Sequence, residues 1–112
     1  MNIHGAVIMS KNENEEWIIL LTDDLTKNAN KLKVYDRVME FLNELVEDLE
    51  KDPEHTIQYL ERQPKIIKIE DKIVRRLRMG RYRLFYFVDH ENKRIVFVDI
   101  RIRRETRKTY RF

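Results

Sequence analysis

The stretch RMGRYRLFYFVD at residues 78–89 decides the fold, because apolar and charged side chains alternate along it. Alternation with a period of two indicates a strand that is buried on one side. From residue 82 onward one face is apolar throughout, and it comprises Tyr82, Leu84, Tyr86 and Val88. The opposite face begins basic and ends aromatic, with Arg81, Arg83, Phe85 and Phe87. The stretch therefore predicts a strand that packs on a core and presents arginines on its other face.

Further strands are indicated on both sides of this stretch. Residues 94–102 are nearly continuously apolar, which is typical of a central strand that is covered on both faces. Residues 65–69 and 73–78 flank a polar turn, so they are either two strands of a hairpin or a loop that leads into one strand. Residues 17–21 form a short apolar run suited to a buried strand. We expect a mainly antiparallel, twisted sheet of four or so strands.

The segment between the first strand and the others is predicted to be helical. Apolar residues spaced three or four apart from Val34 to Lys51 draw one stripe, and acidic residues fill the remainder. A shorter helix follows Thr22, and Pro53 begins a further helical turn. The stripe could be a docking surface, but in a short chain it favours packing against the sheet. The fold class is therefore α+β, with an N-terminal strand and a helical hairpin packed on one face of the sheet.

Length and composition predict a single small domain. The 112 residues include no cysteine, which excludes disulfides and thiolate metal sites. No signal peptide or apolar run long enough to span a bilayer is visible, so we expect a soluble cytoplasmic protein. Residues 1–15 are interpreted as an N-terminal extension or an extra edge strand. The few glycines and prolines, with abundant Lys and Glu, are compatible with a thermophilic source.

Charge divides the chain into two unlike halves. Residues 1–63 contain 7 Lys and Arg against 14 Asp and Glu, whereas residues 64–112 contain 16 against 6. The half that carries the strands therefore has a net charge of +10, against −7 for the other. Single arginines on a sheet most often interact only with solvent or with acidic helices. A surplus of this size instead indicates a surface for a polyanion, such as nucleic acid, or for an acidic protein.

The motif Arg-Met-Gly-Arg-Tyr-Arg at 78–83, followed by Arg104 and then Tyr110, resembles the RelE/ParE superfamily of toxin-antitoxin toxins. In that superfamily the strands read Arg-x-Gly-x-Tyr-Arg, and the last strand ends in an arginine with a tyrosine six residues later. The resemblance implies a RelE-like fold for the single domain, residues 1–112. It also implies a toxin that cleaves translated mRNA on the ribosome and so inhibits translation, without metal or cofactor. In related members it implies inhibition of DNA gyrase instead.

The resemblance also assigns roles to residues. Arg76 matches the basic residue that activates the 2′-hydroxyl, and Arg83 matches the arginine that stabilises the phosphate. Arg104 matches the arginine that assists the leaving group, and Tyr110 matches the aromatic residue that orients the substrate. Because arginine is protonated below about pH 12, electrostatic stabilisation is an easier role for Arg76 than proton abstraction.

Eight further basic residues of this half are candidates for contacting the nucleic-acid backbone. They are Lys68, Arg75, Arg78, Arg81, Arg101, Arg103, Arg107 and Lys108. The expected partners are a cognate antitoxin with an acidic or amphipathic helix and a ribosome with mRNA in its A site. No membrane partner is expected, and no metal ligands are assigned, since His4, His55 and His90 are scattered.

Three functions remain open from the sequence. The first is a ribosome-dependent endoribonuclease, which the arginines and Tyr110 favour. The second is a gyrase inhibitor that acts by protein binding. The third is a non-catalytic basic module that binds nucleic acid or an acidic protein. Residues 102–104 are Ile-Arg-Arg, whereas the superfamily commonly has Gly-His-Arg at this place. The endoribonuclease interpretation therefore lacks the histidine that is common in the superfamily.

Overall fold

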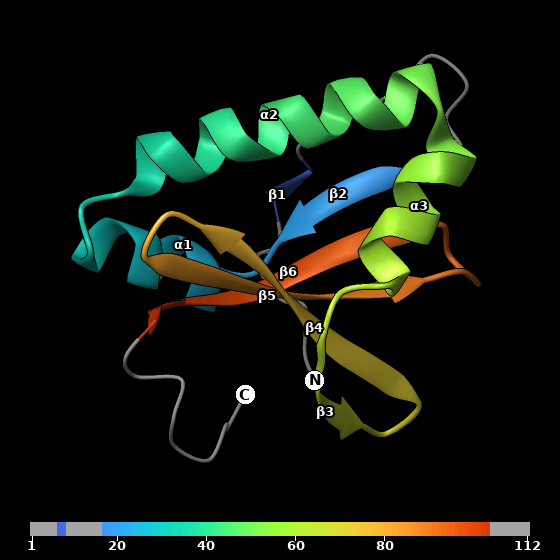
Figure 1. The fold of residues 1–112 in the computed structure, drawn as a ribbon. Coiled ribbons are helices and arrows are strands. Elements are labelled where there is room, and N and C mark those ends of the chain that lie inside the picture. The colour runs from blue at the N-terminus through green and yellow to red at the C-terminus, as the bar shows by residue number, and fades with distance from the viewer. Residues whose placement is uncertain (1–6, 9–16, 104–112) are drawn as a thin grey trace.

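The computed structural model describes residues 7–8 and 17–103, which form one layer of helices on one sheet (Figure 1). The elements are β1 (Val7–Ile8), β2 (Ile18–Leu21), α1 (Asp23–Lys31), α2 (Tyr35–Lys51), α3 (Pro53–Glu61), β3 (Lys65–Ile69), β4 (Lys72–Met79), β5 (Tyr82–Asp89) and β6 (Arg94–Ile102). The α+β class and the placement of the helices on the sheet are confirmed. None of the helices in the described ranges is long and apolar enough to cross a membrane.

The sheet has the strand order β1-β2-β6-β5-β4-β3, so it is larger than the four or so strands expected. The pairing of β2 with β6 is parallel, with Ile19 opposite Ile95, and every other pairing is antiparallel. A parallel pair requires a crossover connection, which the helices and the other strands supply. Residues 65–69 and 72–79 form a hairpin, and β1 is an edge strand beside β2.

The helices form where local sequence signals favour them. The hydroxyl of Thr22 accepts a hydrogen bond from the backbone N–H of Leu25 at 3.3 Å and so caps α1. The carboxylate of Asp52 accepts one from the backbone N–H of His55 at 3.0 Å, and Pro53 occupies the first turn of α3. The predicted stripe on α2 is buried at Val38, Leu42, Leu45 and Leu49.

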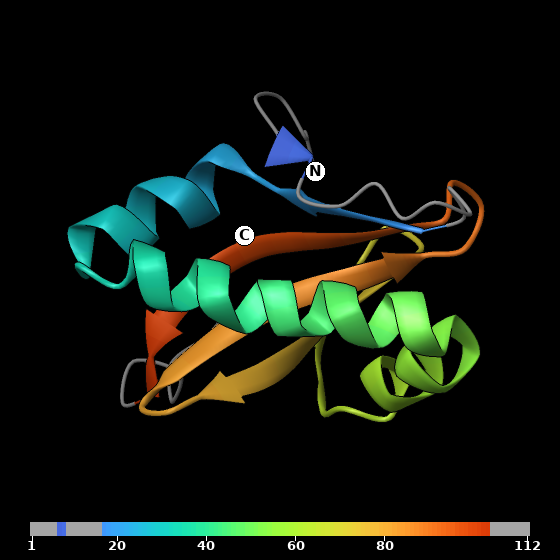
Figure 2. The same ribbon diagram turned by 90° about the horizontal axis from the view of Figure 1, so that it is seen from above.

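The main core lies between this helix layer and the sheet. Figure 2 shows α2 lying across the sheet, above β5. The side chains of Leu84 and Tyr86 point into this core, and the Tyr86 hydroxyl donates a 2.7 Å hydrogen bond to the carbonyl of Leu60 on α3. Burial raises the pKa of the Tyr86 phenol, so this group stays protonated and remains a donor. The bond fixes α3 on β5.

The opposite face of the sheet is covered by no helix of the described chain (Figure 1). One part of this open face carries a second apolar cluster, formed by Leu20, Val74, Phe85, Phe87, Val96 and Val98. Isoleucines of β3 pack against that cluster. Strand β6 thus has buried side chains on both faces, as its apolar run predicts. The other part of the open face is basic.

Candidate nucleic-acid interface

Strand register brings three arginines into one row across the open face. Arg83 of β5 pairs with Arg78 of β4 on one side and with Arg101 of β6 on the other. Residues directly opposite each other in antiparallel strands point to the same face. We call Arg78, Arg83 and Arg101 the arginine row. The neighbouring row consists of Arg76, Phe85 and Asp99, so Arg76 lies next to the arginine row on the same face.

A bulge in β6 is what brings Arg101 to this face. Phe85 pairs with Asp99 and Tyr86 with Phe97, so Val98 is an extra residue in β6. Without the bulge, alternation from Val96 and Val98 would place Ile100 on the open face and Arg101 in the core. With it, Ile100 is buried under the helices, and Asp99 and Arg101 share the face of Arg83.

The central member of the row is also the most buried. Arg83 is only 8% exposed, whereas Arg101 is half-buried and Arg78 is exposed. Like charges placed directly opposite each other in a sheet repel. A guanidinium held among two others in a partly desolvated position favours an anion as its ligand, because the anion relieves this repulsion.

Asp99 supplies a negative charge beside the row. Its Oδ2 accepts a 3.0 Å hydrogen bond and ion pair from Nε of Arg101. Its Oδ1 accepts bonds from Nδ2 of Asn28 on α1 at 2.6 Å and from the backbone N–H of Ile100 at 2.8 Å. The Arg101 guanidinium also lies 5.9 Å from the ring of Phe85. One carboxylate among three guanidiniums leaves the row positively charged.

Asp99 and Asn28 were not predicted as site residues. Asp99 is the one acidic residue in the segment 94–104, and this isolation was a usable signal. The sequence gave no signal for Asn28. Its hydrogen bond to Asp99 forms because α1 packs against the edge of β6 beyond the end of β2.

The basic surface continues around the β4–β5 turn. Gly80 has a φ of +60°, and Arg81 follows it at the exposed tip. The guanidiniums of Arg81 and of Arg37 on α2 lie 5.5 Å and 5.7 Å from the ring of Tyr82. Arg37 belongs to the acidic half of the sequence, so the charge division gave no reason to include it. Near the turn, the backbone N–H of Arg103 donates a 2.7 Å hydrogen bond to the carbonyl of Arg81.

Two of the predicted contact residues lie away from the row. Arg75 pairs with Tyr86, whose ring lies in the main core, and its Nη1 donates a 2.8 Å bond to the carbonyl of Gln63. This contact holds the connection between α3 and β3. Lys68 is exposed on the edge strand β3. The predictions for Arg104, Arg107, Lys108 and Tyr110 lie outside the described residues.

At the end of β4, β5 and β6 that lies away from the arginine row, positive and negative side chains form ion pairs. Asp89 is 1% exposed, and its carboxylate contacts Nε of Arg94 at 2.9 Å and Nζ of Lys72 at 3.5 Å. Burial alone would raise the pKa of Asp89, but hydrogen bonds from Asn92 and Arg94 and the charge of Lys72 hold its pKa well below its usual range. Positive potential is therefore concentrated at the end that carries the arginine row.

Across residues 17–103, no group of three or more His, Asp or Glu side chains is arranged to hold a metal ion. The only histidine in an ion pair of the described part is His90, which lies 2.9 Å from Glu61 on the surface. The chemistry of the described interface is that of guanidinium groups and backbone amides.

Comparison with known proteins identifies the family. No significant match was found among curated proteins or among solved structures. A family model described as the ParE toxin of the type II toxin-antitoxin system parDE matches residues 19–107, from β2 to beyond β6. This match confirms the superfamily that the arginine motif indicates, and it implies a cognate antitoxin. The chain belongs to the ParE toxin family of type II toxin-antitoxin systems.

Proposed function

We propose that this toxin arrests growth by cleaving mRNA on the ribosome in the cytoplasm, with the arginine row holding the scissile phosphate. The observation that carries the proposal is the position of Arg83, which is nearly buried and lies between Arg78 and Arg101. Guanidinium groups bind phosphate through paired N–H donors, and fixed donors stabilise charge that develops in a transition state. The row supplies such donors from three strands of one rigid sheet.

In the proposed reaction, the 2′-oxygen of the RNA forms a bond to the adjacent phosphorus, and the bond to the 5′-oxygen breaks. The proton of the 2′-hydroxyl passes to solvent water, and the departing 5′-oxygen gains a proton from water. Arg83 stabilises the added negative charge on the phosphate oxygens. Arg76, one row away, adds to this stabilisation and keeps its own proton. For the leaving-group and orienting steps we retain Arg104 and Tyr110 as the proposed residues, and the ribosome, with the mRNA in its A site, positions the RNA.

Gyrase inhibition is the second candidate, and one observation favours it. In the described part of the interface, the carboxylate nearest the row is Asp99, which already accepts hydrogen bonds from Asn28, Ile100 and Arg101. Both oxygens of this carboxylate therefore already accept hydrogen bonds from the protein. A basic face whose one described carboxylate is engaged in this way favours binding of an acidic or nucleic-acid surface without chemistry. The same reasoning applies to a non-catalytic basic module.

Purified toxin variants separate these candidates. Ribosomes programmed with an mRNA are incubated with wild type, Arg83→Ala and Arg62→Ala, and the RNA ends are mapped. Arg62 is an exposed arginine on the helix layer and is the matched control. We expect cleavage by wild type and by Arg62→Ala, and a loss on the order of a hundredfold in Arg83→Ala.

A supercoiling assay with DNA gyrase is run on the same proteins. Inhibition of gyrase by wild type without RNA cleavage would contradict the nuclease and establish the second candidate. Absence of both activities in a folded wild type would favour the non-catalytic module.

A further inference from the structure

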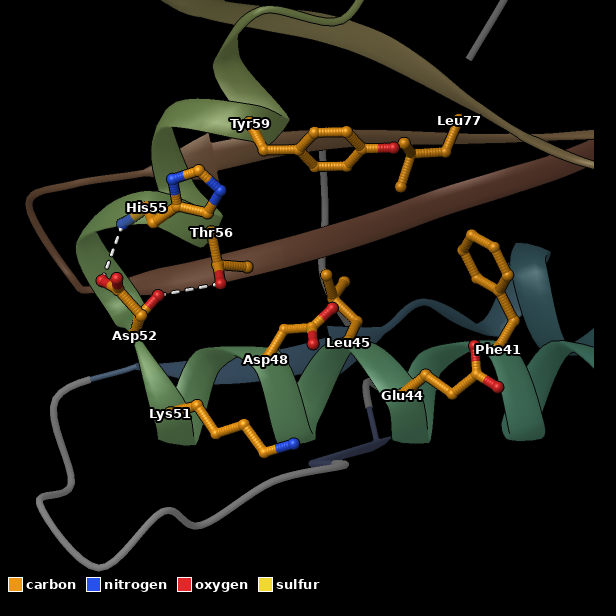
Figure 3. Close-up of a pocket in the computed structure, with 10 residues that line it drawn as sticks. All are labelled: Phe41, Glu44, Leu45, Asp48, Lys51, Asp52, His55, Thr56, Tyr59 and Leu77. Carbon is orange, nitrogen blue, oxygen red and sulfur yellow. Dashed lines mark hydrogen bonds between the residues drawn. The ribbon is translucent and has the colours of Figure 1, made fainter.

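A groove on the helix layer is not explained by the arginine row. It has a volume of about 430 Å³ and lies between α2 and α3, with β4 at its back (Figure 3). Its lining consists of Phe41, Glu44, Leu45, Asp48, Lys51, Asp52, His55, Thr56, Tyr59 and Leu77. None of these residues belongs to the arginine row, because the row lies on the opposite face of the sheet.

The floor and one wall of the groove are apolar. Phe41 and Leu45 reach into it from α2, and Leu77 reaches into it from β4 (Figure 3). Tyr59 of α3 is 47% exposed, which makes it the one exposed large hydrophobic side chain in the described ranges. Figure 3 shows its ring pointing across the groove toward Leu77. An exposed aromatic residue beside an apolar floor is typical of a site that receives another side chain.

The rim is acidic. Glu44 and Asp48 stand one helical turn apart on α2, both exposed, and neither forms an ion pair with another described residue. Asp52 adds a third carboxylate, which is engaged in capping α3 through the backbone N–H of His55. With Lys51 as the one lysine or arginine of the lining, the groove keeps an excess of two negative charges.

We propose that this groove receives a cationic, apolar segment of the antitoxin. One large apolar side chain of the segment lies against Phe41, Leu77 and Tyr59. A lysine or arginine next to it pairs with Asp48 and Glu44. The proposal follows from the charge of the rim, since a basic side chain complements the two carboxylates that have no described ion-pair partner.

The size of the groove limits its occupant. A volume of about 430 Å³ is within the range of small-ligand pockets, and it admits one or two side chains of a bound segment. The segment therefore anchors by a short motif, with the remainder of its length on the acidic outer surface of α2. An antitoxin that also neutralises the arginine row must carry an acidic segment for that face and a basic one for this groove. The proposal rests on family membership, and it holds for a nuclease or a gyrase inhibitor alike.

The first test uses two synthetic amphipathic peptides as probes. One carries leucine and phenylalanine on its apolar face and lysine elsewhere, and the other has glutamate in place of each lysine. Binding to full-length toxin is measured by fluorescence anisotropy with wild type, Asp48→Lys and Glu47→Lys. Glu47 is exposed on the same helix but does not line the groove, so its reversal matches the change in charge.

We expect the lysine peptide to bind wild type and Glu47→Lys, and to bind Asp48→Lys about tenfold more weakly, which corresponds to about 1.4 kcal/mol. Tyr59→Ala should weaken it by a similar factor, while Gln58→Ala should not. Equal weakening by Asp48→Lys and Glu47→Lys would overturn the proposal, because it would show general attraction to an acidic helix. Equal binding of the glutamate peptide would overturn it as well.

The second test uses the cognate antitoxin that membership of the family implies. Toxin variants are expressed in growing cells with and without it, and colony formation is counted. We expect Asp48→Lys and Tyr59→Ala to remain toxic alone and to be neutralised less well than Glu47→Lys. Neutralisation equal to that of wild type would overturn the proposal. Loss of toxicity in Arg83→Ala, in contrast, concerns only the function of the opposite face.

Discussion

Asp99 and Arg101, two residues apart on β6, form an ion pair of 3.0 Å that orients the Arg101 guanidinium at the position opposite Arg83. Both side chains face the open side of the sheet only because Val98 is bulged out of the pairing. The carboxylate is in turn held by Asn28, so α1 contributes to the geometry of the arginine row through one hydrogen bond.

Removing the charge of Asp99 should destabilise the fold and release Arg101. We expect Asp99→Asn to lower the free energy of unfolding by about 2 kcal/mol, because a buried charge-assisted hydrogen bond is lost. Asn28→Ala should lower it by about 1 kcal/mol. Because both changes act on the same carboxylate, the double variant should lose less than the sum of the two. Urea denaturation measures all three, and additive losses would show that the contacts are independent.

Inorganic phosphate should stabilise the wild-type toxin through the arginine row. An anion that binds only the folded state raises the melting temperature with its concentration. We expect phosphate to raise it more than chloride does at equal ionic strength, and Arg83→Gln to abolish this difference. The control is Arg62→Gln, which keeps the same net charge as Arg83→Gln but leaves the row intact. Equal phosphate effects in both variants would refute a phosphate site at the row.

The β4–β5 turn should depend on glycine at position 80. Gly80 has a φ of +60°, and a Cβ added there would meet Nη2 of Arg37 at 3.2 Å. The end of an arginine side chain moves easily, so the backbone conformation is the larger obstacle. We expect Gly80→Ala to lower the free energy of unfolding by about 1 kcal/mol, by a similar amount in wild type and in an Arg37→Ala background. A loss that vanishes in that background would show that the contact with Arg37 is the cause.

Acid should destabilise the toxin through Asp89. The pKa of Asp89 is lowered in the folded state, so its ion pairs contribute stability above the unfolded pKa of about 4, and this contribution is lost as the pH falls below it. We expect Asp89→Asn to be less stable at pH 7 and to show a smaller decrease in stability between pH 5 and pH 3. Chemical denaturation at several pH values between 3 and 7 measures the free energy of unfolding of both proteins. Parallel pH curves for the two proteins would assign the acid sensitivity to other carboxylates.

Local patterns were sufficient for much of the fold. The alternation along residues 82–88 correctly separated the core face of β5 from its arginine face, and the spacing of Val38, Leu42 and Leu49 correctly placed α2 on the sheet. Each signal lies within a single strand or helix, so it can be recognised without knowing which other element packs against it. The hairpin of β3 and β4 remained one of two alternatives, because a polar turn is compatible with either.

The non-local features could not be predicted. A run of four apolar residues at β2 does not reveal that it pairs in parallel with β6. The bulge at Val98 changes which residues of β6 share the face of Arg83, and nothing in the apolar run marks it. Arg37 and Asn28 join the site only through helix packing. The sequence therefore predicted candidate site residues strand by strand. Which of these residues lie side by side depends on the strand register, which the sequence did not reveal.

The parallel pairing of β2 with β6 also determines when the arginine row can assemble during synthesis. The hydroxyl of Thr22, just after β2, donates a 2.9 Å bond to the carbonyl of Val98, which is 76 positions later in the chain. The centre of the sheet cannot close until β6 has left the ribosome, and β6 also supplies Arg101 and Asp99. A nascent chain that ends before β6 has neither a complete sheet nor an arginine row. The arginine row is thus assembled only after β6 has been synthesised and has paired with β2 and β5.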